Sequence, residues 1–307
     1  MANLLITGGT GSFGQAMVRH VLANTDWTIR VFSRDEQKQD RMKREIPDAR
    51  VRYLLGDVRD AARVRRALHD CDYVVHAAAL KIIPAGEYNP DEVIKTNVMG
   101  SHNVIEESVD AGVGHLVCIS SDKAVAPVNL YGNTKACMEK LALLANQSSR
   151  ATDISVVRYG NVIGSRGSIL TILKEQAATG SLRITHPSMT RFWITLPEAC
   201  EFVMRVLRQP TGGHVYVPPM RSCSVQDLCT HLYPTTPIVY TGMRNGEKMH
   251  EWLTNEYEVA EDLGWAWRVD PAKWVTGKPM SSEDTLVMVE ELLGIGGMLE
   301  QVQAAAI

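Results

Sequence analysis

Gly8-Gly-Thr-Gly-Ser-Phe-Gly14 stands between a short apolar run, Asn3–Thr7, and an amphipathic segment, Ser12–Asn24. In such a strand–turn–helix setting, one glycine permits a tight turn and the next lets the backbone approach a pyrophosphate. The third allows the helix to pack closely on the strand. The pattern therefore predicts a dinucleotide-binding loop at the start of a βαβ unit. The expected cofactor contacts are Gly8, Thr10, Gly11, Ser12, Phe13 and Gly14.

Outward from this loop, short apolar runs alternate with helix-length amphipathic segments. Continuous Val/Ile/Leu strands separated by helices indicate a parallel sheet covered on both faces. Right-handed crossovers make this a doubly wound, Rossmann-type α/β fold. The predicted strands are Asn3–Thr7, Thr28–Ser33, Val51–Leu55, Tyr73–Ala77, His115–Ser120 and Ile154–Tyr159. The predicted helices include Ser12–Asn24, Asp60–Asp70, Asp91–Ala111 and Tyr131–Asn146.

Beyond residue 164 the predicted elements become shorter and less regular. A helix is expected over Pro197–Arg208, a strand over His214–Pro218, and a helix with a capping box from Ser224 to His231. We expect residues 1–165 to form the dinucleotide-binding Rossmann domain, with 190–219 returning to it. Residues 166–189 and 220–307 are expected to form a smaller α/β substrate-binding lobe.

Composition argues against several classes of function. The chain has 307 residues and a net charge of −3, so neither nucleic acid nor an anionic membrane is indicated as a partner. No apolar run approaches the ~20 residues that span a bilayer. The six cysteines include no C-x-x-C pair and no zinc-like grouping, which indicates reduced structural thiols and no metal site. We expect a soluble, cytoplasmic protein.

The end of the second predicted strand indicates which dinucleotide binds. NAD-binding proteins usually place an acid there to accept from the ribose 2′-hydroxyl, whereas this chain has Ser33 and Arg34, with Lys38 a turn later. A guanidinium and an ammonium suit a 2′-phosphate, so NADP is favoured over NAD. Two alternatives stay open: Asp35 could accept from the ribose, and Arg34 and Lys38 could be solvated surface residues. Asp57 could accept from the adenine amino group or cap the following helix.

A second segment, Ser120-Ser-Asp-Lys-Ala-Val-Ala-Pro-Val-Asn-Leu-Tyr-Gly-Asn-Thr-Lys135, carries candidate catalytic groups. Tyr131 and Lys135 are four residues apart at a predicted helix start, so they share one face. A nearby ammonium and a cationic nicotinamide favour the phenolate and lower the pKa of Tyr131 from about 10 toward neutrality. Tyr131 is therefore expected to act as a base for an alcohol, with Ser121 ahead of it on a strand tip.

Asp122 and Lys123 exceed what an alcohol dehydrogenase needs. They are expected to project from the carboxyl edge of the sheet, where substrates bind. A carboxylic acid can protonate a leaving hydroxyl, and an amine of depressed pKa can remove an acidified carbon-bound proton. The pair predicts loss of water next to a transient ketone. The alternative is an Asp–Lys turn in solvent.

These motifs resemble the extended short-chain dehydrogenase/reductases. More narrowly, they are similar to the soluble, inverting UDP-N-acetylglucosamine 4,6-dehydratases that start pseudaminic acid synthesis. The resemblance extends from the N-terminus to about Glu251, and more weakly through Ser281–Leu293. Retaining dehydratases carry Asp-Glu where this chain has Asp122-Lys123, and 4-epimerases lack the pair. Besides the two segments above, the resemblance rests on His76-Ala-Ala-Ala-Leu-Lys81, Glu87-Tyr-Asn-Pro90, Lys95-Thr-Asn97, Arg158-Tyr-Gly-Asn-Val162, Met189-Thr-Arg-Phe-Trp-Ile-Thr195 and Gly246-Glu-Lys248.

The resemblance implies a redox-neutral reaction. Tyr131 takes the O4 proton while hydride leaves C4 for NADP, Lys123 removes the C5 proton, and Asp122 protonates the departing O6. Hydride then returns to C6, and C5 is reprotonated on the opposite face by Lys123 or Tyr131. The same resemblance implies that Ser121 binds O4 and that Lys135 holds the nicotinamide ribose.

Other site residues follow from the same comparison. Asn161 and Arg244 are expected near the UDP diphosphate and Glu247 on the uridine ribose, with Lys81 and Arg191 as further phosphate or sugar contacts. For Lys81 and Arg191 the alternatives are a solvated lysine and a structural arginine. Additional expected cofactor contacts are Val58, Ala77, Ala78, Lys81, Tyr131 and Lys135.

The chain departs from the family pattern at three positions. Ser121 replaces a more usual Thr, Ile82 a frequent His, and Ala126 an Asn. The alternative functions are a UDP-hexose 4-epimerase and a non-catalytic dinucleotide-binding sensor. The family resemblance implies a homo-oligomer, either a dimer or a hexamer.

Overall fold

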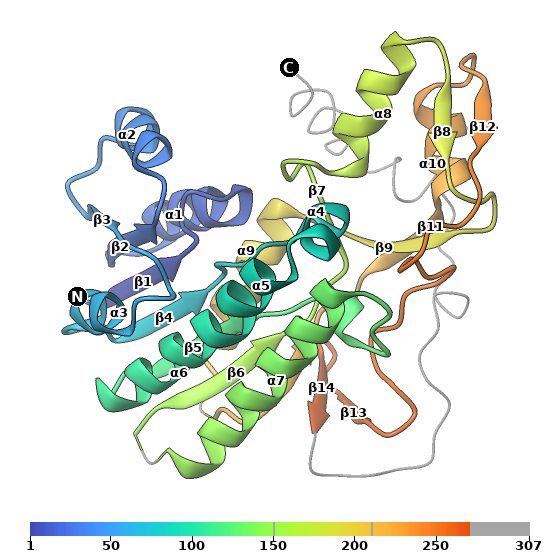
Figure 1. Ribbon diagram of the computed structural model, residues 1–307. Coiled ribbons are helices and arrows are strands. Elements are labelled where there is room, and N and C mark those ends of the chain that lie inside the picture. Colours follow the sequence, from blue (N-terminus) through green and yellow to red (C-terminus); the bar gives the residue numbers. More distant parts are fainter. Residues whose placement is uncertain (150, 210, 271–307) are drawn as a thin grey trace.

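A long, mostly parallel sheet forms the centre of the molecule (Figure 1). The computed structural model describes residues 1–149, 151–209 and 211–270. In this part of the chain the sheet has the order β13-β14-β10-β6-β5-β4-β1-β2-β3. From β1 the chain adds β2 and β3 on one side of the sheet, and then β4, β5 and β6 on the other. The switch point of this doubly wound fold therefore lies between β1 and β4, as expected from the sequence.

The first six strands confirm the predicted ones to within two residues at each end. Their pairing is parallel throughout, and β1, β5 and β6 consist almost entirely of buried residues, as strands covered on both faces should. Their bounds are β1 Asn3–Thr7, β2 Thr28–Ser33, β3 Val51–Leu55, β4 Tyr73–His76, β5 His115–Ile119 and β6 Asp153–Val157.

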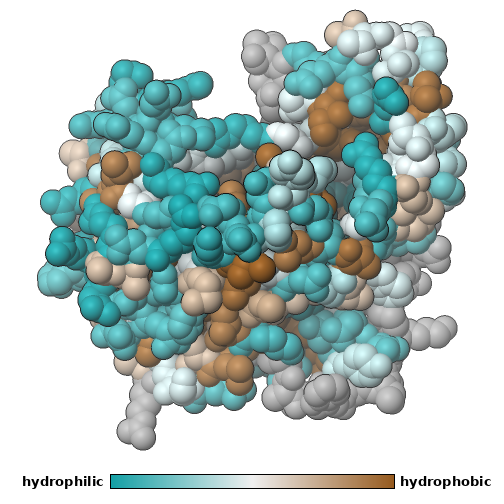
Figure 2. Space-filling view, in the orientation of Figure 1, coloured by the Kyte–Doolittle hydropathy of each residue, from teal (hydrophilic) through white to brown (hydrophobic). Residues whose placement is uncertain are grey.

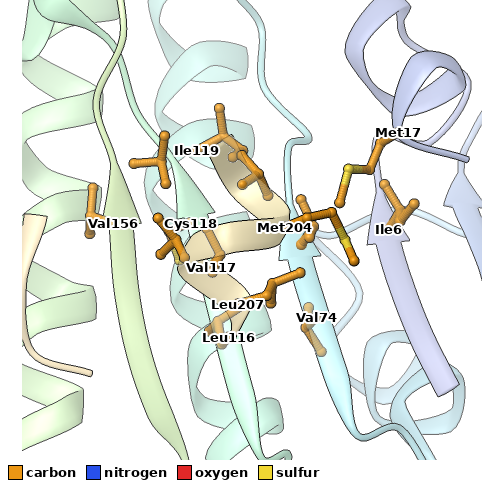
Figure 3. Packing of buried hydrophobic residues seen from close by; sticks show 14 of the residues in the cluster. Ile6, Met17, Val74, Leu116, Val117, Cys118, Ile119, Val156, Met204 and Leu207 are labelled. Atoms are coloured by element: carbon orange, nitrogen blue, oxygen red, sulfur yellow. The ribbon is translucent and has the colours of Figure 1, made fainter. Parts of the chain in front are cut away.

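Helices cover both faces of this sheet. On one face α1 packs beside α9, and on the other α3, α6 and α7 lie side by side (Figure 1). Met204 and Leu207 of α9 lie among apolar side chains of β1, β4 and β5, which places the main core beneath α9 (Figure 3). The helix bounds here are α1 Ser12–Asn24, α2 Glu36–Glu45, α3 Ala61–Leu68, α6 Gly100–Asp110, α7 Leu130–Ser148 and α9 Leu196–Leu207.

The single helix predicted over Asp91–Ala111 is wrong in detail. The structure has α5 Pro90–Val93, a π-helical turn η1 Ile94–Met99, and then α6. The extra residue in a π-turn lets Asn97, which is buried, bond away from its own helix. Its amide accepts from Leu80 N and donates to Leu80 O and Thr134 Oγ1, so the turn holds the loop after β4 against α7.

A smaller set of elements lies beside the carboxyl end of the large sheet and has its own apolar cluster. Parallel β7 and β9 and antiparallel β11 form one short sheet, and parallel β8 and β12 form another. The bounds are β7 Asn161–Ile163, α8 Ile169–Ala178, β8 Leu182–Ile184, β9 Thr190–Thr195, β11 Arg221–Ser224, α10 Val225–Leu232 and β12 Ile238–Tyr240, whereas α4 Ile83–Tyr88 contacts α5 and α7.

The chain returns to the large sheet three times after residue 190. As the sequence indicates, α9 packs on β5 and β6, and β10 Val215–Val217 pairs with β6. A hairpin then adds β13 Val259–Asp262 and β14 Trp267–Asp270 antiparallel at the edge, although the sequence places residues 220–307 in the smaller lobe. An antiparallel edge hairpin needs no crossover helix, so the alternation that marks βαβ units gave no signal for it. The division into two domains stays a prediction.

Two helix caps differ from expectation. Ser224 caps α10 by accepting from Asp227 N, but the return bond of a capping box is not formed there. The capping box occurs instead at α9, where Thr195 and Glu198 bond to each other's backbone. Among the described residues, no helix is both long enough and apolar enough to cross a membrane.

His76, at the end of β4, is fully buried and links the first half of the sheet to α6. Its Nδ1 lies 2.7 Å from Thr7 Oγ1 and its Nε2 lies 2.9 Å from Ser101 Oγ. Burial, together with the nearby Lys135 charge, lowers the pKa of His76 to about 3. The ring is therefore neutral in the folded protein at neutral pH.

This burial predicts a dependence of stability on pH. Because the folded pKa lies below the ordinary value of about 6.5, stability is lost as pH falls through that value toward about 3, by at most ~1.4 kcal/mol per pH unit. His76→Gln should flatten the slope measured by chemical denaturation between pH 6.5 and 4. His69→Gln, in which an exposed ring is replaced, should keep the wild-type slope. Equal slopes in wild type and His76→Gln would contradict this assignment.

Candidate active site

The expected catalytic and cofactor-binding residues come together at the carboxyl ends of the parallel strands. Loops that follow β1, β2, β4, β5 and β6 meet at this edge, and the smaller elements around α8 stand beside it (Figure 1). Figure 2 shows a notch in the surface between α1 and the part that carries α8. This is where a doubly wound fold binds its ligands.

The glycine-rich loop has the geometry of a phosphate cradle. Gly8 has a left-handed φ of +66°, and a Cβ there would lie 2.9 Å from Ala78 N and Cα. A Cβ on Gly14 would lie 2.5 Å from Gly9 Cα, so only glycine permits this approach of α1 to the loop. Gly11 is the N-cap of α1 and no side chain caps that helix, which leaves its first N–H groups for an anion. These residues fit a dinucleotide pyrophosphate.

Neighbouring expected contacts form the wall of this cradle. Thr7 Oγ1 accepts from the backbone N–H of Ala77 and Ala78, which ties the end of β4 to the glycine loop. Val58 is buried and occupies the space beside Gly100, where a Cβ would lie 2.6 Å from its Cγ2. Phe13 lies with its ring centroid 6.4 Å from that of Tyr159. Val58 and Phe13 thus provide apolar surroundings for a nucleotide and no polar ligand.

Arg166 crosses the same loop and was not predicted. Its guanidinium donates to Thr10 O at 2.6 Å, and its backbone N–H donates to Ser12 Oγ at 2.9 Å. It follows β7, so a segment from the smaller elements reaches the cofactor loop. An arginine at this place is suited to phosphate oxygens. In the sequence, Arg166 is a basic residue in a Gly/Ser-rich loop, a pattern too common to predict a phosphate contact.

The guanidinium of Arg34, which follows β2, is accessible to solvent. Arg34 is half exposed, and its nearest carboxylate, Asp57 Oδ2, is 3.8 Å from Nη1. Asp35 caps α2 by accepting from Lys38 N and pairs with Lys38 Nζ at 2.5 Å, and the hydrogen bonds to Lys38 lower the pKa of Asp35. Asp35 is therefore occupied by Lys38 rather than turned to a ribose, and Lys38 is occupied by Asp35. Ser33 is fixed by Gln39 Nε2, which donates to its hydroxyl and carbonyl oxygens.

Asp57 does not cap the following helix. Asp60 is the N-cap of α3, and Asp57 instead binds Arg59, whose Nη2 lies 2.7 Å from Oδ2. Arg59 also donates to Glu92 Oε2 at 2.7 Å. Asp57 remains at the rim of the expected adenine site, but its carboxylate is held by an arginine.

Asp122 and Lys123 form a buried ion pair directly after β5. Lys123 Nζ lies 3.0 Å from Asp122 Oδ1, which also accepts from Ser121 Oγ at 2.8 Å. The side chain of Asp122 has no exposed surface and that of Lys123 is 17% exposed, which argues against a turn in solvent. Asp122 Oδ2 has no hydrogen-bond partner among the described residues. A buried carboxylate oxygen without a protein partner is unusual, and it leaves Asp122 able to accept or donate a further hydrogen bond.

Tyr131 lies in the first turn of α7, its hydroxyl forms a hydrogen bond with Ser121, and the charge of Lys123 acts on it. Burial raises the pKa of Tyr131; the Lys123 charge and a hydrogen bond with Ser121 oppose this, while the Asp122 charge adds to it. The expectation that Lys135 lowers this pKa is wrong for the protein alone. Lys135 is buried and donates to Ile119 O at 2.6 Å, and burial lowers its own pKa to about 8. The cation that faces Tyr131 is Lys123.

The lysine after β4 completes the cationic side of the site. Lys81 is exposed, and partial desolvation together with the charges of Arg166 and Lys123 lowers its pKa. The charges of Arg166, at the cofactor loop, and of Lys123 thus both act on Lys81, and its place in the two ligand sets stays a prediction.

Of the remaining expected substrate-binding residues, one contacts the Asp122–Lys123 pair and two do not. Asn161, at the start of β7, accepts from Lys123 Nζ at 3.3 Å and so lies beside the expected catalytic lysine. Arg191 on β9 donates to the carbonyls of Thr190, Lys248 and Met249, which gives it a structural role in holding that segment. Arg244 is exposed.

Residues 241–258 form a segment that lies over the end of β5, and we call it the covering segment. Glu247 in this segment accepts from Arg244 N at 3.2 Å, so the two expected nucleotide contacts are neighbours. Lys248 Nζ donates to Val125 O at 2.8 Å, and Gly246 O accepts from Asn129 Nδ2 at 2.9 Å. The covering segment is thus attached to two residues that follow the Asp122–Lys123 turn.

Two buried residues of the covering segment were missed. Glu251 Oε1 lies 3.8 Å from Lys123 Nζ, and Glu251 Oε2 lies 2.7 Å from Lys248 Nζ. The Lys248 contact is an ion pair without hydrogen-bond geometry, so Oε2 has no hydrogen-bond partner among the described residues. Burial alone would lower the pKa of Lys123, but the charges of Asp122 and Glu251 raise it above its ordinary value. The expected depressed pKa of this amine is therefore wrong for the protein alone, because two carboxylates outweigh the desolvation. Glu251 is a lone acid in the sequence, without a motif of its own.

Arg158 fixes the far end of the covering segment. Its guanidinium is buried and donates to Glu139 on α7, to Glu258, and to the carbonyl oxygen of Leu253. Ser120 Oγ also bonds to Glu139, so this network reaches the residue before Ser121. The buried arginine cluster, which consists of Arg158, Glu139 and Glu258, therefore ties the covering segment to α7 and to the end of β5.

Comparison with known proteins gives a family match over most of the chain. The family model described as polysaccharide biosynthesis protein matches residues 4–266. A UDP-N-acetylglucosamine 4,6-dehydratase (inverting) from Campylobacter jejuni is 44% identical over 254 residues, 81% of this chain and 76% of that protein. A UDP-glucose 4-epimerase from Rickettsia canadensis is 39% identical over 279 residues, 87% of this chain and 82% of that protein.

Solved structures agree with the fold. Pen from Bacillus thuringiensis has a TM-score of 0.88 and 35% identity, with 95% of each chain covered. DesIV from Streptomyces venezuelae, a dTDP-glucose 4,6-dehydratase with NAD and TYD bound, has a TM-score of 0.72 at 22% identity and covers 80% of this chain and 86% of its own. The second likeness supports the Rossmann-type fold alone.

The arginine cluster yields a matched pair of substitutions. Arg158→Met leaves two buried carboxylates without their cation, and should lower the free energy of unfolding by about 3–5 kcal/mol. Arg268→Met removes a surface partner of Glu261 and should cost less than about 1 kcal/mol. Chemical denaturation measures both, and similar losses in the two variants would contradict the role assigned to Arg158.

Proposed function

The chain belongs to the polysaccharide biosynthesis protein family, within the extended short-chain dehydrogenase/reductases, and we propose that it is a hydro-lyase that dehydrates UDP-N-acetylglucosamine with inversion at C5. The product would be a UDP-2-acetamido-2,6-dideoxy-L-arabino-hexos-4-ulose. The observation that carries the proposal is the buried Asp122–Lys123 ion pair beside Tyr131. An acid, a base and a phenol in one place are what removal of water next to a ketone requires.

NADP is the proposed cofactor. The cradle at Gly8, Gly11 and Gly14 fits a pyrophosphate, and Arg34 is free of any carboxylate within hydrogen-bond distance among the described residues. Asp35, the acid that could have selected a ribose hydroxyl, is engaged with Lys38. When bound, the nicotinamide would accept a hydride from C4 of the sugar and later return it to C6.

Tyr131 and Ser121 are proposed to act on O4. Deprotonated Tyr131 takes the O4 proton as the C4–H bond breaks, and Ser121 hydrogen-bonds the same oxygen. Because the pKa of Tyr131 is raised in the protein alone, its phenolate depends on Lys123 and on the positive charge of the oxidised nicotinamide. Lys135, which is buried beneath this site, is proposed to hold the nicotinamide ribose.

The ion pair contains the proton that elimination needs. Transfer of one proton from Lys123 Nζ to Asp122 along their 3.0 Å contact gives a neutral amine and a carboxylic acid. Lys123 then takes the C5 proton, Asp122 gives its proton to O6, and water leaves as a C5–C6 double bond forms. The pair is thereby returned to the ionised state seen in the structure. Since the side chain of Asp122 has no exposed surface, its contact with O6 requires that the groups covering it move.

Reprotonation of C5 completes the reaction, with Lys123 and Tyr131 as candidate donors. Once the elimination has charged Lys123 and the first step has protonated Tyr131, both carry the required proton. Delivery to the face opposite the one that lost it inverts C5.

Nucleotide binding is assigned to the covering segment and its neighbours. Arg244 is exposed and suits a diphosphate, and Glu247 beside it suits paired ribose hydroxyls. Asn161 and Lys81 flank the pair and are proposed to contact phosphate or sugar. Arg191 acts chiefly by holding the covering segment at Lys248 and Met249.

Assembly and location are further parts of the proposal. Apolar residues are exposed on η1 and α7, with Ile94, Met99 and Leu144 among them, and apolar surface gathers over the middle of the face in Figure 2. Such a surface suits a homo-oligomer, a dimer or hexamer. The six cysteines are free, which is typical of a cytoplasmic protein. The proposed product would enter pseudaminic acid synthesis.

A 4-epimerase is the alternative that the Rickettsia relative keeps open. Incubated with UDP-N-acetylglucosamine in deuterated water, the protein should give a product lighter by one water and labelled at C5. Lys123→Ala should lower kcat at least about 10²-fold because the base is lost. Mass spectrometry and NMR measure both. A fully hydroxylated, unlabelled 4-epimer, or full turnover by Lys123→Ala, would contradict the proposal.

Cofactor choice gives a second prediction. Arg34→Ala should weaken NADP binding by about ten- to a hundred-fold, because a charged hydrogen bond to the 2′-phosphate is lost, and should leave NAD binding nearly unchanged. Titration calorimetry or fluorescence measures both. Lys43→Ala, on an exposed turn of α2, is the control and should bind NADP as wild type does. Equal weakening toward NAD and NADP would contradict the assignment.

A further inference from the structure

We propose that Glu251 is a positioning residue for Lys123, and that Glu251 and Lys248 together set how firmly the Asp122–Lys123 pair holds its shared proton. This inference rests on the proposed dehydration. It assigns a role to two buried residues that none of the steps above uses.

The geometry places Lys123 between two carboxylates. Its ammonium lies 3.0 Å from Asp122 Oδ1 and 3.8 Å from Glu251 Oε1, and it donates to Asn161 Oδ1 at 3.3 Å. The side chain of Glu251 is only 4% exposed. A buried carboxylate needs a cation close to it, and Glu251 lies between two, Lys123 and Lys248.

Lys248 balances the charge of Glu251. Its ammonium lies 2.7 Å from Glu251 Oε2 and is anchored by Val125 O, three residues after Asp122. The order Asp122, Lys123, Glu251, Lys248 therefore alternates anion and cation across a buried site. Removing the charge of Glu251 or that of Lys248 changes the electrostatic potential at Lys123, and the two removals act in opposite directions.

The consequence for the reaction follows from the proton count. The Asp122–Lys123 pair is active while it holds one shared proton. Loss of that proton at high pH leaves Asp122 without a proton to give to O6. The negative charge of Glu251 stabilises the ammonium form and so delays that loss, while Lys248 weakens the effect of Glu251. Other groups facing Lys123 are the cations of Arg191 and Lys81, and Tyr131 and Asp122.

The pH profile of kcat tests this inference with full-length protein and UDP-N-acetylglucosamine. Glu251→Gln should move the alkaline limb to lower pH by about one unit, because the ammonium of Lys123 loses a stabilising charge. Lys248→Met should move it to higher pH, because the charge of Glu251 is no longer balanced. A merely structural role would lower kcat in both variants without opposite shifts of the limb.

Two controls keep the test decisive. Glu251→Asp retains the charge and should keep the limb near its wild-type position, and Glu256→Gln, on an exposed part of the same segment, should be indistinguishable from wild type. If Glu251→Gln does not fold, the upward shift in Lys248→Met still tests the inference. Limbs that stay fixed or shift in the same direction overturn the role of Glu251 while the proposed function stands. A wild-type protein without dehydrated product overturns both.

Discussion

Burial of the Asp122–Lys123 ion pair at the carboxyl end of β5 is the constraint on which the site depends. Two charges withdrawn from water need complementary partners, and Ser121, Asn161 and Glu251 provide them from three different parts of the chain. The covering segment, fixed by Arg158 and Lys248, keeps this turn from solvent. An exposed Asp–Lys turn would not hold an acid and a base around one shared proton away from solvent.

Local sequence patterns predicted the central part of the fold. Continuous apolar runs gave the strands from Asn3 to Val157, and the Gly8–Gly14 spacing placed the cofactor loop at the start of α1. Tyr131 and Lys135 fell on α7 as their spacing indicated. These features depend on neighbours within about ten residues, which is why one sequence reveals them.

Features that depend on distant contacts could not be predicted in this way. The π-turn at Ile94–Met99 exists because Asn97 bonds to Leu80 and Thr134, and the edge hairpin of β13 and β14 depends on pairing with β10. Glu251 becomes part of the site only because the covering segment folds over β5, 128 residues after Lys123. The raised pKa of Tyr131 has the same origin, since burial by that surrounding structure exceeds the effect of nearby cations.

The central claim is that this pair directs hydrogen taken from C4 toward C6 instead of back to C4. UDP-N-acetylglucosamine deuterated at C4 distinguishes the two outcomes by NMR of the product. We predict deuterium at C6 of a 6-deoxy-4-keto sugar with the wild-type protein, and none at C6 with Lys123→Ala. Deuterium found at C4 of a fully hydroxylated 4-epimer of the substrate would contradict the claim.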